Sequence, residues 1–428
     1  MIDIVVLDGD LNRIDVVDNY ESLIWVSRYN DIGDCELYLP ATDKAIQLLR
    51  KGYYLARDDD DMVCRIERVE IDTDVENGNY LAVTGYDVKK ILDQRVIWSQ
   101  MNVDGYVEDE LRTMVQNSVC TPALYGRQIK NSVGQQMFYL GDPAGFTEVT
   151  TEQISYKNVG EKIREICLKY HWGYKVVIES NKFWFVLYDG TDRTSSVVFS
   201  EDYENLRSTK YIDDSSNLAN VALVAGEGEG SQRSRNVSGY AEGIDRYEIF
   251  VDAKDLSRTI KFEELTDLYP LSSVGGQGYI DGKYYKMSYI NIAIVDADQL
   301  AQLEINYPNG EEITIDGNLY YRTYDPIIAD LETTAPTGDE SVILRPIIYD
   351  IYLLNRGYEK MSEYSGIITF EGSVEPDVTF TYKQDYFLGD IVTVVNKYGI
   401  EVGARIVEVI ENEDSNGYKL EPKFEYQQ

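Results

Sequence analysis

The chain has 428 residues, of which 75 are acidic and 40 basic, so its formal net charge at neutral pH is −35. Hydrophobic residues make up 43% of the chain, which is enough to fill folded cores, so the acidity describes the surface and does not indicate disorder. Nucleic acid is disfavoured as a bound ligand, because phosphate binding needs clustered Lys and Arg, and the length predicts two to four domains.

The cysteines and the single histidine exclude several kinds of site. The four cysteines are Cys35, Cys64, Cys120 and Cys167, and none forms a CxxC pair. With one histidine, His171, they cannot build a zinc finger or ribbon, so we expect reduced, buried thiols and synthesis in a cytoplasm. The acidic start of the chain is not a signal peptide, and no segment offers the roughly 18 uncharged apolar residues of a membrane span.

The N-terminal 90 residues predict an all-β unit with one short helix. An Asp8-Gly9 turn joins apolar segments 2–7 and 12–17 into a hairpin. Alternating or β-branched patterns predict further strands at 22–26, 35–40, 62–71 and 80–84, and a helix at 43–50.

Residues 96–200 predict an α/β unit. Helices are expected at 87–95 and 107–117, followed by a poorly periodic loop or arm over 119–153, and strands at 174–178 and 183–188. Asn158 and Glu161 form a capping box for a helix over 159–170, on which Cys167 belongs to the apolar stripe.

The remaining chain returns to β structure. Strands are predicted at 198–200, 206–212, 220–226, 246–251 and 289–295, with a loop over 226–245, a hairpin at Asn309-Gly310 and a linker over 332–340. Residues 366–428 are again β. Their Leu388-Gly389-Asp390 turn, the strands that follow it and the Pro422 edge are typical of a small closed β-barrel. The fold class is therefore mainly β with α/β parts.

Possible chemistry is sparse. His171 lies four residues after Cys167, so the two could form a thiolate–imidazolium pair, but Cys167 lies on an apolar stripe and His171 at a helix end, which favours structural roles. Asp8-Gly9-Asp10 resembles the start of a calcium loop, but Arg13 and Asn19 stand where Gly and Glu are needed.

Two other acidic segments are equally unspecific. Asp58–Asp61 could hold a cation, although four adjacent carboxylates usually form a solvated turn. Gly226–Gly230 alternates Gly with Glu and cannot cradle phosphate, because its glutamates would repel it. We therefore assign no catalytic, cofactor-binding or metal-binding residue and expect no enzyme activity or cofactor.

Motifs spread over most of the chain resemble the siphovirus tail-hub family, the tail-tip proteins related in fold to the central baseplate hub of contractile phages. The matching segments include Trp25 through Gly33 to Pro40, Gly85-Tyr86-Asp87, Tyr188 to Thr194, Asn220-Val221-Ala222, Gly243 to Glu248, Leu388-Gly389-Asp390 and Arg405-Ile406. Residues 265–340 do not map onto the family pattern.

The resemblance implies a homotrimer that closes the tail tube, with two β-barrel domains in each chain. We expect the first barrel at 1–95, an α/β domain at 96–200, the second barrel at 201–257 together with 366–428, and an inserted domain at 258–365. Implied partners are the distal tail protein, tail tube, tape measure protein and receptor-binding or fibre proteins, in the virion tail tip. An acidic channel would let DNA pass without binding it.

Two alternatives remain open. The 36 tyrosines and the many carboxylates also suit a carbohydrate-binding or carbohydrate-active β protein. A calcium-dependent adhesion module is the other. A monomer in solution would favour the carbohydrate interpretation, and metal analysis would test the adhesion module.

Overall fold

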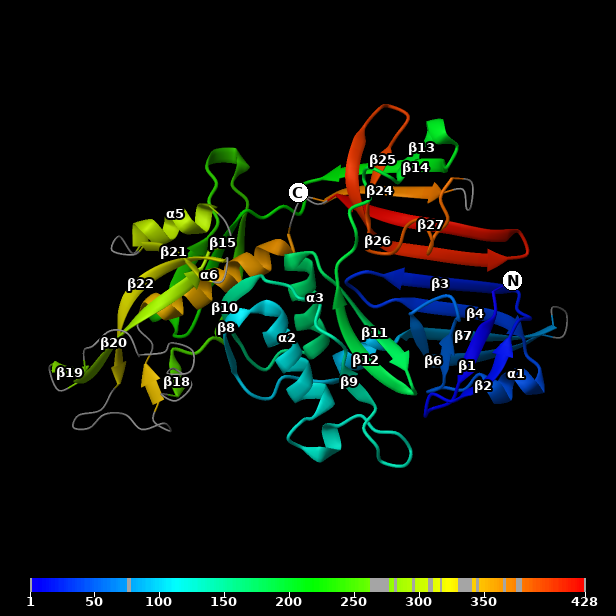
Figure 1. Ribbon diagram of the computed structural model, residues 1–428, viewed down its shortest axis with the longest axis horizontal. Helices are drawn as coiled ribbons and strands as arrows, with labels where there is room; N and C mark the ends of the chain where they lie inside the picture. Colours follow the sequence, from blue (N-terminus) through cyan, green and yellow to red (C-terminus); the bar gives the residue numbers. More distant parts are fainter. Residues whose placement is uncertain are drawn as a thin grey trace.

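The computed structural model describes residues 2–74, 78–261, 277–280, 283–294, 297–306, 311–315, 318–329, 341–343, 346–364, 367–374 and 379–426. The fold is mainly β, as expected. Figure 1 shows an elongated molecule, with the N-terminal and C-terminal strands side by side at one end and the segments 283–294, 297–306 and 318–329 at the other. The helices and strands of the α/β segment lie between them.

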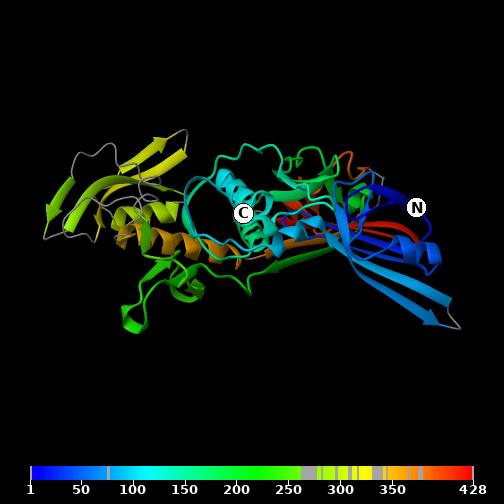
Figure 2. The ribbon, with the colours of Figure 1, turned by 90° about the horizontal axis from the view of Figure 1, so that it is seen from below.

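The N-terminal segment forms a β unit because its strands alternate between buried and exposed positions. In β4, for example, Cys35, Leu37 and Leu39 are buried, whereas Glu36 and Tyr38 face solvent. The elements are β1 (Ile4–Leu7), β2 (Arg13–Val17), β3 (Ser22–Arg28), β4 (Asp34–Pro40), α1 (Asp43–Leu48), β5 (Tyr54–Ala56), β6 (Val63–Asp74) and β7 (Gly78–Asp87). The β6–β7 hairpin extends well beyond the body (Figure 2).

The C-terminal β unit combines strands from both sides of the distal insertion. They are β13 (Val198–Ser200), β14 (Leu206–Asp214), β24 (Ile367–Val374), β25 (Ile391–Val395), β26 (Glu401–Asp414) and β27 (Gly417–Tyr426). β26 also pairs antiparallel with β3, from Glu408 opposite Arg28 to Asp414 opposite Ser22. One 13-stranded sheet therefore runs through both β units.

This shared sheet corrects the expectation of closed barrels. Within the part of the chain that the structure describes, hydrogen bonding closes neither unit; the main path of the sheet ends at β14 and at β2. Because β3 and β26 bond to each other, the two units are joined edge to edge. Each still has its own buried core, one centred on Trp25 and the other on Phe199 and Phe424.

The α/β segment contains the largest apolar cluster, packed around α2, α3 and the β11–β12 hairpin. Its elements are the 3₁₀ helix η1 (Val88–Gln94), β8 (Met101–Tyr106), α2 (Val107–Val115), the π-helical turn η2 (Gln116–Cys120), η3 (Tyr125–Arg127), β9 (Phe138–Leu140), β10 (Val149–Ile154), α3 (Val159–Tyr170), β11 (Gly173–Glu179), β12 (Lys182–Tyr188) and η4 (Glu201–Tyr203). The predicted α3 cap is confirmed, because the Asn158 side chain accepts a hydrogen bond from the Glu161 amide.

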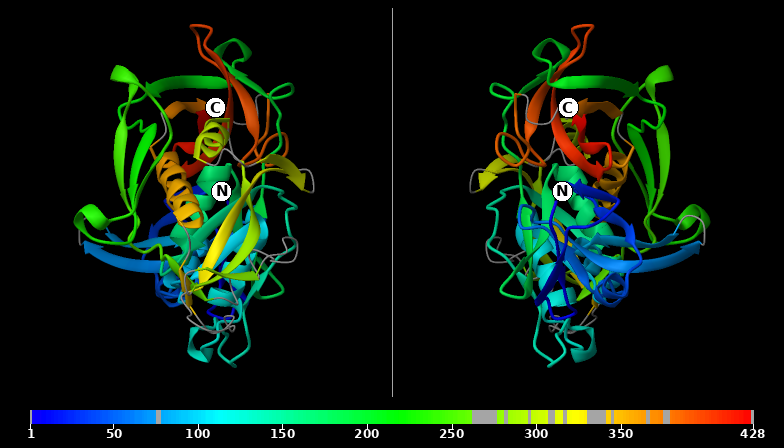
Figure 3. Two further views of the ribbon diagram at one scale, coloured as in Figure 1. Left: turned by 90° about the vertical axis from the view of Figure 1, so that its left-hand side faces the viewer. Right: turned by 90° about the vertical axis from the view of Figure 1, so that its right-hand side faces the viewer.

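The distal part differs most from the sequence-based expectations. Its elements are β15 (Val221–Ala225), η5 (Gly230–Gln232), β16 (Arg235–Ser238), η6 (Gly243–Asp245), β17 (Glu248–Asp252), β18 (Thr259–Lys261), β19 (Gln277–Ile280), β20 (Lys283–Ala293), α5 (Ala297–Asn306), β21 (Glu311–Ile315), β22 (Asn318–Ala329), β23 (Ser341–Ile343) and α6 (Pro346–Ser362). α6 packs against β15 and β16, as the end views in Figure 3 also show.

Three expectations there were wrong or fall outside the described residues. The predicted loop 226–245 contains β16, which pairs with β15. The helices α5 and α6 were not foreseen, and α5 occupies the place of the first strand of the expected Asn309-Gly310 hairpin. The Asn309-Gly310 turn itself and the 332–340 linker lie outside the described residues. No helix among the described residues is long and apolar enough to cross a membrane.

Candidate functional site

The turn Leu388-Gly389-Asp390 lies where the α/β segment meets the C-terminal β unit. Asp390 is buried, and one carboxylate oxygen accepts a hydrogen bond from the Thr191 amide at 2.7 Å. The other pairs with Arg193 Nε at 2.5 Å and accepts from the Phe387 amide at 3.0 Å. Segments almost 200 residues apart, both among those that resembled the tail-hub family, therefore meet at one carboxylate.

A second contact of the same kind is built around Arg405. Its Nη1 donates to Asp189 Oδ1 at 2.7 Å and to the Gly389 carbonyl at 2.6 Å. The Tyr29 hydroxyl donates to the same Asp189 oxygen at 3.0 Å, and the Arg405 guanidinium lies over the Tyr29 ring. A residue from each β unit and one that follows β12 thus share one polar cluster, in which Arg405 is buried and the Asp189 side chain is 49% exposed.

Glycine is required where these segments approach most closely. A Cβ on Gly190 would lie 1.8 Å from the Gly389 carbonyl oxygen, so no side chain fits there. Gly389 has φ of 97°, and a Cβ on it would lie 2.5 Å from the Tyr29 ring. The glycines of the two motifs are therefore explained by packing across the junction.

The two β units are also joined by a buried ion-pair network. Arg57 follows β5 and bonds Asp59 through Nε and Nη2, and its Nη2 lies 3.0 Å from Glu411 Oε2 on β26. Lys383 Nζ lies 3.1 Å from the other Glu411 oxygen and 2.7 Å from Asp60. Burial opposes the charged form of Arg57, but the hydrogen bond to Asp59 and the charge of Glu411 raise its pKa above the ordinary value.

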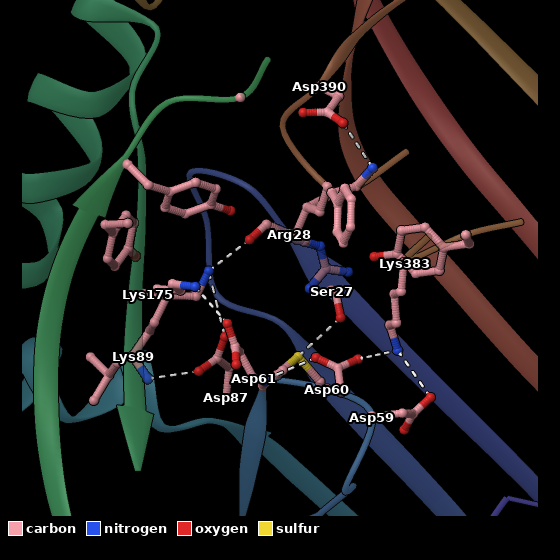
Figure 4. A pocket seen from close by; sticks show the side chains of 18 of the residues that line it. Ser27, Arg28, Asp59, Asp60, Asp61, Asp87, Lys89, Lys175, Lys383 and Asp390 are labelled. Atoms are coloured by element: carbon pink, nitrogen blue, oxygen red, sulfur yellow. Dashed lines mark hydrogen bonds and ion pairs between the residues drawn. The ribbon is translucent and has the colours of Figure 1, made fainter. Parts of the chain in front are cut away.

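Next to this network lies a cavity of about 580 Å³ (Figure 4). It is lined by β3, the loop 58–61, β11, the end of β12 and the segment 382–390. Its charges are largely paired across it: Asp61 with Lys175 at 2.5 Å, and Asp60 with Lys383. These ion pairs hold the loop 58–61 against β11 and against the segment 382–390.

Lys89 and Asp87 form a buried pair at the edge of the same cavity. Lys89 Nζ lies 3.5 Å from Asp87 Oδ2 and donates to the Arg28 carbonyl at 2.7 Å. Burial lowers the pKa of Lys89 and raises the pKa of Asp87. The hydrogen bond from Lys89 to the Arg28 carbonyl fixes η1 against the end of β3.

A second buried network links the α/β segment to the distal part. Lys162 on α3 lies 3.0 Å from both Glu152 on β10 and Glu359 on α6. Arg356 on α6 also pairs with Glu359, at 3.2 Å. Burial acts against it, but the charges of Lys162 and Arg356 hold the pKa of Glu359 well below the ordinary value.

The structure gives Cys167 and His171 structural surroundings. Cys167 is fully buried, and burial raises the pKa of its thiol; burial together with the charge of Arg405 lowers the pKa of His171. These shifts disfavour a thiolate–imidazolium pair. His171 instead ends α3 in the left-handed conformation, with φ of 58°. All four cysteines are free and buried, as expected.

The acidic candidates have protein partners. Asp58, Asp59, Asp60 and Asp61 pair with Arg13, Arg57, Lys383 and Lys175, respectively. Among the described residues, no group of three or more His, Cys, Asp or Glu side chains could hold a metal ion. Asp8 closes the β1–β2 turn by accepting from the amides of Asp10 and Asn12, which confirms the hairpin.

The Gly226–Gly230 segment is tied to α6. The Glu227 amide donates to the Tyr349 hydroxyl at 2.7 Å, and Arg233 Nε donates to the Gly226 carbonyl at 2.7 Å. The sequence analysis assigned no role to Arg57, Glu411 or Lys383, although Arg57 ends a segment, Gly52–Arg57, that resembles the tail-hub family. Their signal was weak, since isolated charges beside β strands are usually solvent-exposed.

The comparisons with known proteins point to one class. The sequence model of the family described as Siphovirus ReqiPepy6 Gp37-like protein matches residues 3–424. No curated protein shows significant sequence similarity to the chain. Among solved structures, the 43 kDa tail protein of prophage MuSo2 from Shewanella oneidensis is similar, with a TM-score of 0.50, 9% identity, and coverage of 99% of this chain and 98% of that one.

Two further tail proteins are similar over most of their length. One is the tail protein from Neisseria meningitidis MC58, with a TM-score of 0.49, 11% identity, and coverage of 99% of this chain and 96% of that chain. The other is the prophage tail protein gp18 from Listeria monocytogenes EGD-e, with a TM-score of 0.46, 11% identity, and coverage of 99% and 94%, respectively. At these identities, the likeness to the Shewanella protein supports the fold alone.

Proposed function

This chain belongs to the Siphovirus ReqiPepy6 Gp37-like family of siphovirus tail proteins, and on that premise we propose that it is the structural hub of a phage tail tip. Three copies form a ring that closes the tail tube and anchors the tip and receptor-binding proteins. The ring's acidic channel lets DNA pass without binding it. The chain carries no catalytic activity in this assignment.

The observation that carries the proposal is the continuous sheet through both β units. One chain presents two β units side by side, joined through β3 and β26, so three chains present six units to a six-fold tube. The buried Arg57–Glu411 pair and the hydrogen bond from Arg405 to the Tyr29 hydroxyl cross between the two units and favour a fixed angle between them. A fixed angle is what a ring of defined curvature requires.

A division of the chain into four domains is also part of the proposal. We propose a first β domain at 1–95, an α/β domain at 96–200, a second β domain at 201–257 together with 366–428, and an inserted domain at 258–365. The β domains face the tail tube and the distal tail protein, the channel receives the tape measure protein, and the other domains face receptor-binding or fibre proteins. The protein is made in the bacterial host cytoplasm and resides in the virion.

The net charge supports the channel and sets a condition on assembly. Three copies of a −35 chain repel one another, so apolar and Tyr-rich contacts must hold the ring together. Raising the ionic strength from about 0.1 M to about 1 M shortens the Debye length from about 10 Å to about 3 Å. The trimer should therefore hold or tighten as salt increases.

Sedimentation across this salt range tests the assignment. The expected mass is about three times the 48.9 kDa of one chain at every salt concentration above the lowest. A monomer throughout would favour the carbohydrate-binding alternative. A trimer that dissociates as salt rises would show that opposite charges, and not apolar contacts, hold the ring.

A further inference from the structure

One region of this acidic chain contains cations but no carboxylate. Residues 94–103 and 111–141 include no Asp or Glu, although the chain has 75 acidic residues in total. The second stretch forms an arm between α2 and β9 that extends beyond the body of the molecule (Figures 1 and 3). The four cations of this region are all partly exposed. Arg112 on α2 donates to the Gly141 carbonyl at 2.7 Å, and the other three are Arg95, Arg127 and Lys130.

Arg127 holds the two stretches together. Its Nη2 donates to the Val96 carbonyl at 2.6 Å, and its guanidinium carbon lies 4.2 Å from the centroid of the Trp98 ring. Arg95 Nε donates to the Arg127 carbonyl at 3.0 Å. Lys130 Nζ donates to the Tyr125 carbonyl at 3.2 Å and lies over the ring of the same residue.

None of these three cations pairs with a carboxylate of the described residues. Their partners are backbone carbonyls and aromatic rings, and Asp93, two residues before Arg95, pairs with Arg164 instead. A carboxylate does touch the arm at Asp10, which accepts a hydrogen bond from the Ser132 amide at 2.8 Å. Burial, together with the neighbouring charge of Arg127, lowers the pKa of Arg95. The charges of Arg95 and Arg127 thus oppose each other.

The same surface exposes large apolar rings. Trp98 is 60% exposed, Tyr125 is 72% exposed, and Tyr156 is 71% exposed on the neighbouring segment, whose Lys157 carbonyl accepts from the Ile97 amide. Trp, Tyr and Arg are the residue types that dominate binding energy at protein interfaces. Exposed rings among unpaired cations match a partner that offers carboxylates beside apolar side chains.

We propose that this surface, formed by Arg95, Trp98, Tyr125, Arg127, Lys130 and Tyr156, binds an acidic polypeptide segment of another tail protein. A nucleic acid is the poorer fit, because the surface contains only three cations and the remainder of the chain, whose net charge is −35, repels phosphate. A second copy is also a poorer fit, because in the proposed ring the copies meet through the β units. The choice of another protein over a second copy rests on that proposed function.

The test uses the full chain and a short fluorescein-labelled peptide of alternating Glu and Leu, with a Lys–Leu peptide as the opposite-charge probe. Binding is followed by the anisotropy of the label and by the emission of Trp98, the most exposed of the four tryptophans. We expect saturable binding of the acidic peptide, and Lys130→Glu should weaken it about tenfold or more. Trp98→Ala should weaken it as well, by removing the stacking surface.

The matched control is Lys397→Glu. Lys397 also lies over a tyrosine ring, that of Tyr398, in the exposed turn after β25, so the variant changes the net charge equally. Its affinity should stay within about twofold of the unmodified chain. Thermal unfolding of each variant tests whether it is folded. If Trp98→Ala is not folded, the proposal is decided by comparing the peptide affinity of Lys130→Glu with that of Lys397→Glu.

Absence of saturable binding of the acidic peptide would overturn the proposal, and so would an equal loss of peptide affinity in Lys130→Glu and Lys397→Glu. Tighter binding of a single-stranded oligonucleotide than of the peptide would overturn it in favour of nucleic acid. A fourth contradicting result is loss of self-association in Lys130→Glu. The last would mean that the surface binds a second copy. An unmodified chain that is monomeric yet binds the acidic peptide at this surface would contradict the proposed ring and leave this surface intact.

Discussion

Replacing Glu411 by glutamine tests whether a buried ion pair joins the two β units. The Arg57 and Glu411 side chains are 2% and 4% exposed, and Glu411 bonds both Arg57 and Lys383. Glu411→Gln keeps the size of the side chain and removes its charge. Two cations then lose one carboxylate partner each, while the strand pairing of β26 with β3 is untouched.

The magnitude follows from the partners that remain. Arg57 keeps its two hydrogen bonds to Asp59, and Lys383 keeps Asp60 at 2.7 Å. A hydrogen bond to a charged group contributes about 1.5–3 kcal/mol, and the new amide oxygen can replace one of the two. We therefore expect Glu411→Gln to lower the free energy of unfolding by about 2–4 kcal/mol.

Asp59→Asn is the matched control. It removes a charge from the same arginine, but the Asp59 side chain is 59% exposed, so water replaces much of what is lost. The expected cost is about 1 kcal/mol or less. The difference between the two variants isolates the contribution of burial.

Urea unfolding is the assay, with Trp25 fluorescence as the local probe. Trp25 is fully buried, and the Arg57 guanidinium lies 5.7 Å from its ring centroid, so its emission reports on the junction. Arg57→Met combined with Glu411→Gln completes a double-mutant cycle, with an expected coupling of about 1–3 kcal/mol. Equal losses in Glu411→Gln and Asp59→Asn, or a coupling near zero, would refute the reasoning.

Three further predictions concern packing and pH. Gly190→Ala should cost about 2–3 kcal/mol in thermal or urea unfolding, because its Cβ would meet the Gly389 carbonyl, whereas Gly126→Ala, with open space around it, should cost little. Burial raises the pKa of Asp350 from the ordinary 3.8 to about 6, so the cost to the folded state grows between these two pH values and is complete above the higher one. Asp350→Asn should therefore stabilise by about 1–2 kcal/mol at pH 7.5 and not at pH 3.5. Because the pKa of Glu359 is lowered in the folded protein, the carboxylate stabilises the fold above the ordinary pKa of 4.5, and this stabilisation is lost as pH falls through the folded-state pKa. Glu359→Gln should therefore lower the free energy of unfolding at pH 7 and much less in acid. An equal loss at both pH values would contradict the pairing with Lys162.

Local signals predicted local structure well. The start of α3 and the Asp8 turn follow from hydrogen bonds within a few residues, so the sequence alone indicated both. The resemblance also identified Asp390 and Gly389, because their motifs are continuous in the chain. Neither source of information, however, indicated that these motifs meet one another across the junction.

What could not be predicted depends on contacts between distant residues. Arg57 and Glu411 are 354 positions apart, and each resembles an ordinary surface charge of a β strand until the two sheets are joined. The helix α6 was missed because its first half, Pro346–Leu354, is an almost unbroken apolar run with β-branched and aromatic residues, a pattern that equally suits a buried strand. Its packing against β15 and β16 decides the outcome.

The central claim is that three copies build a ring in which six β units surround a channel. Electron microscopy of the purified protein, at a salt concentration that screens the net charge, measures this directly. The account predicts ring-shaped particles with three-fold symmetry, six similar densities around the centre and a central opening. Particles the size of one chain, or assemblies without a rotational axis, would contradict it.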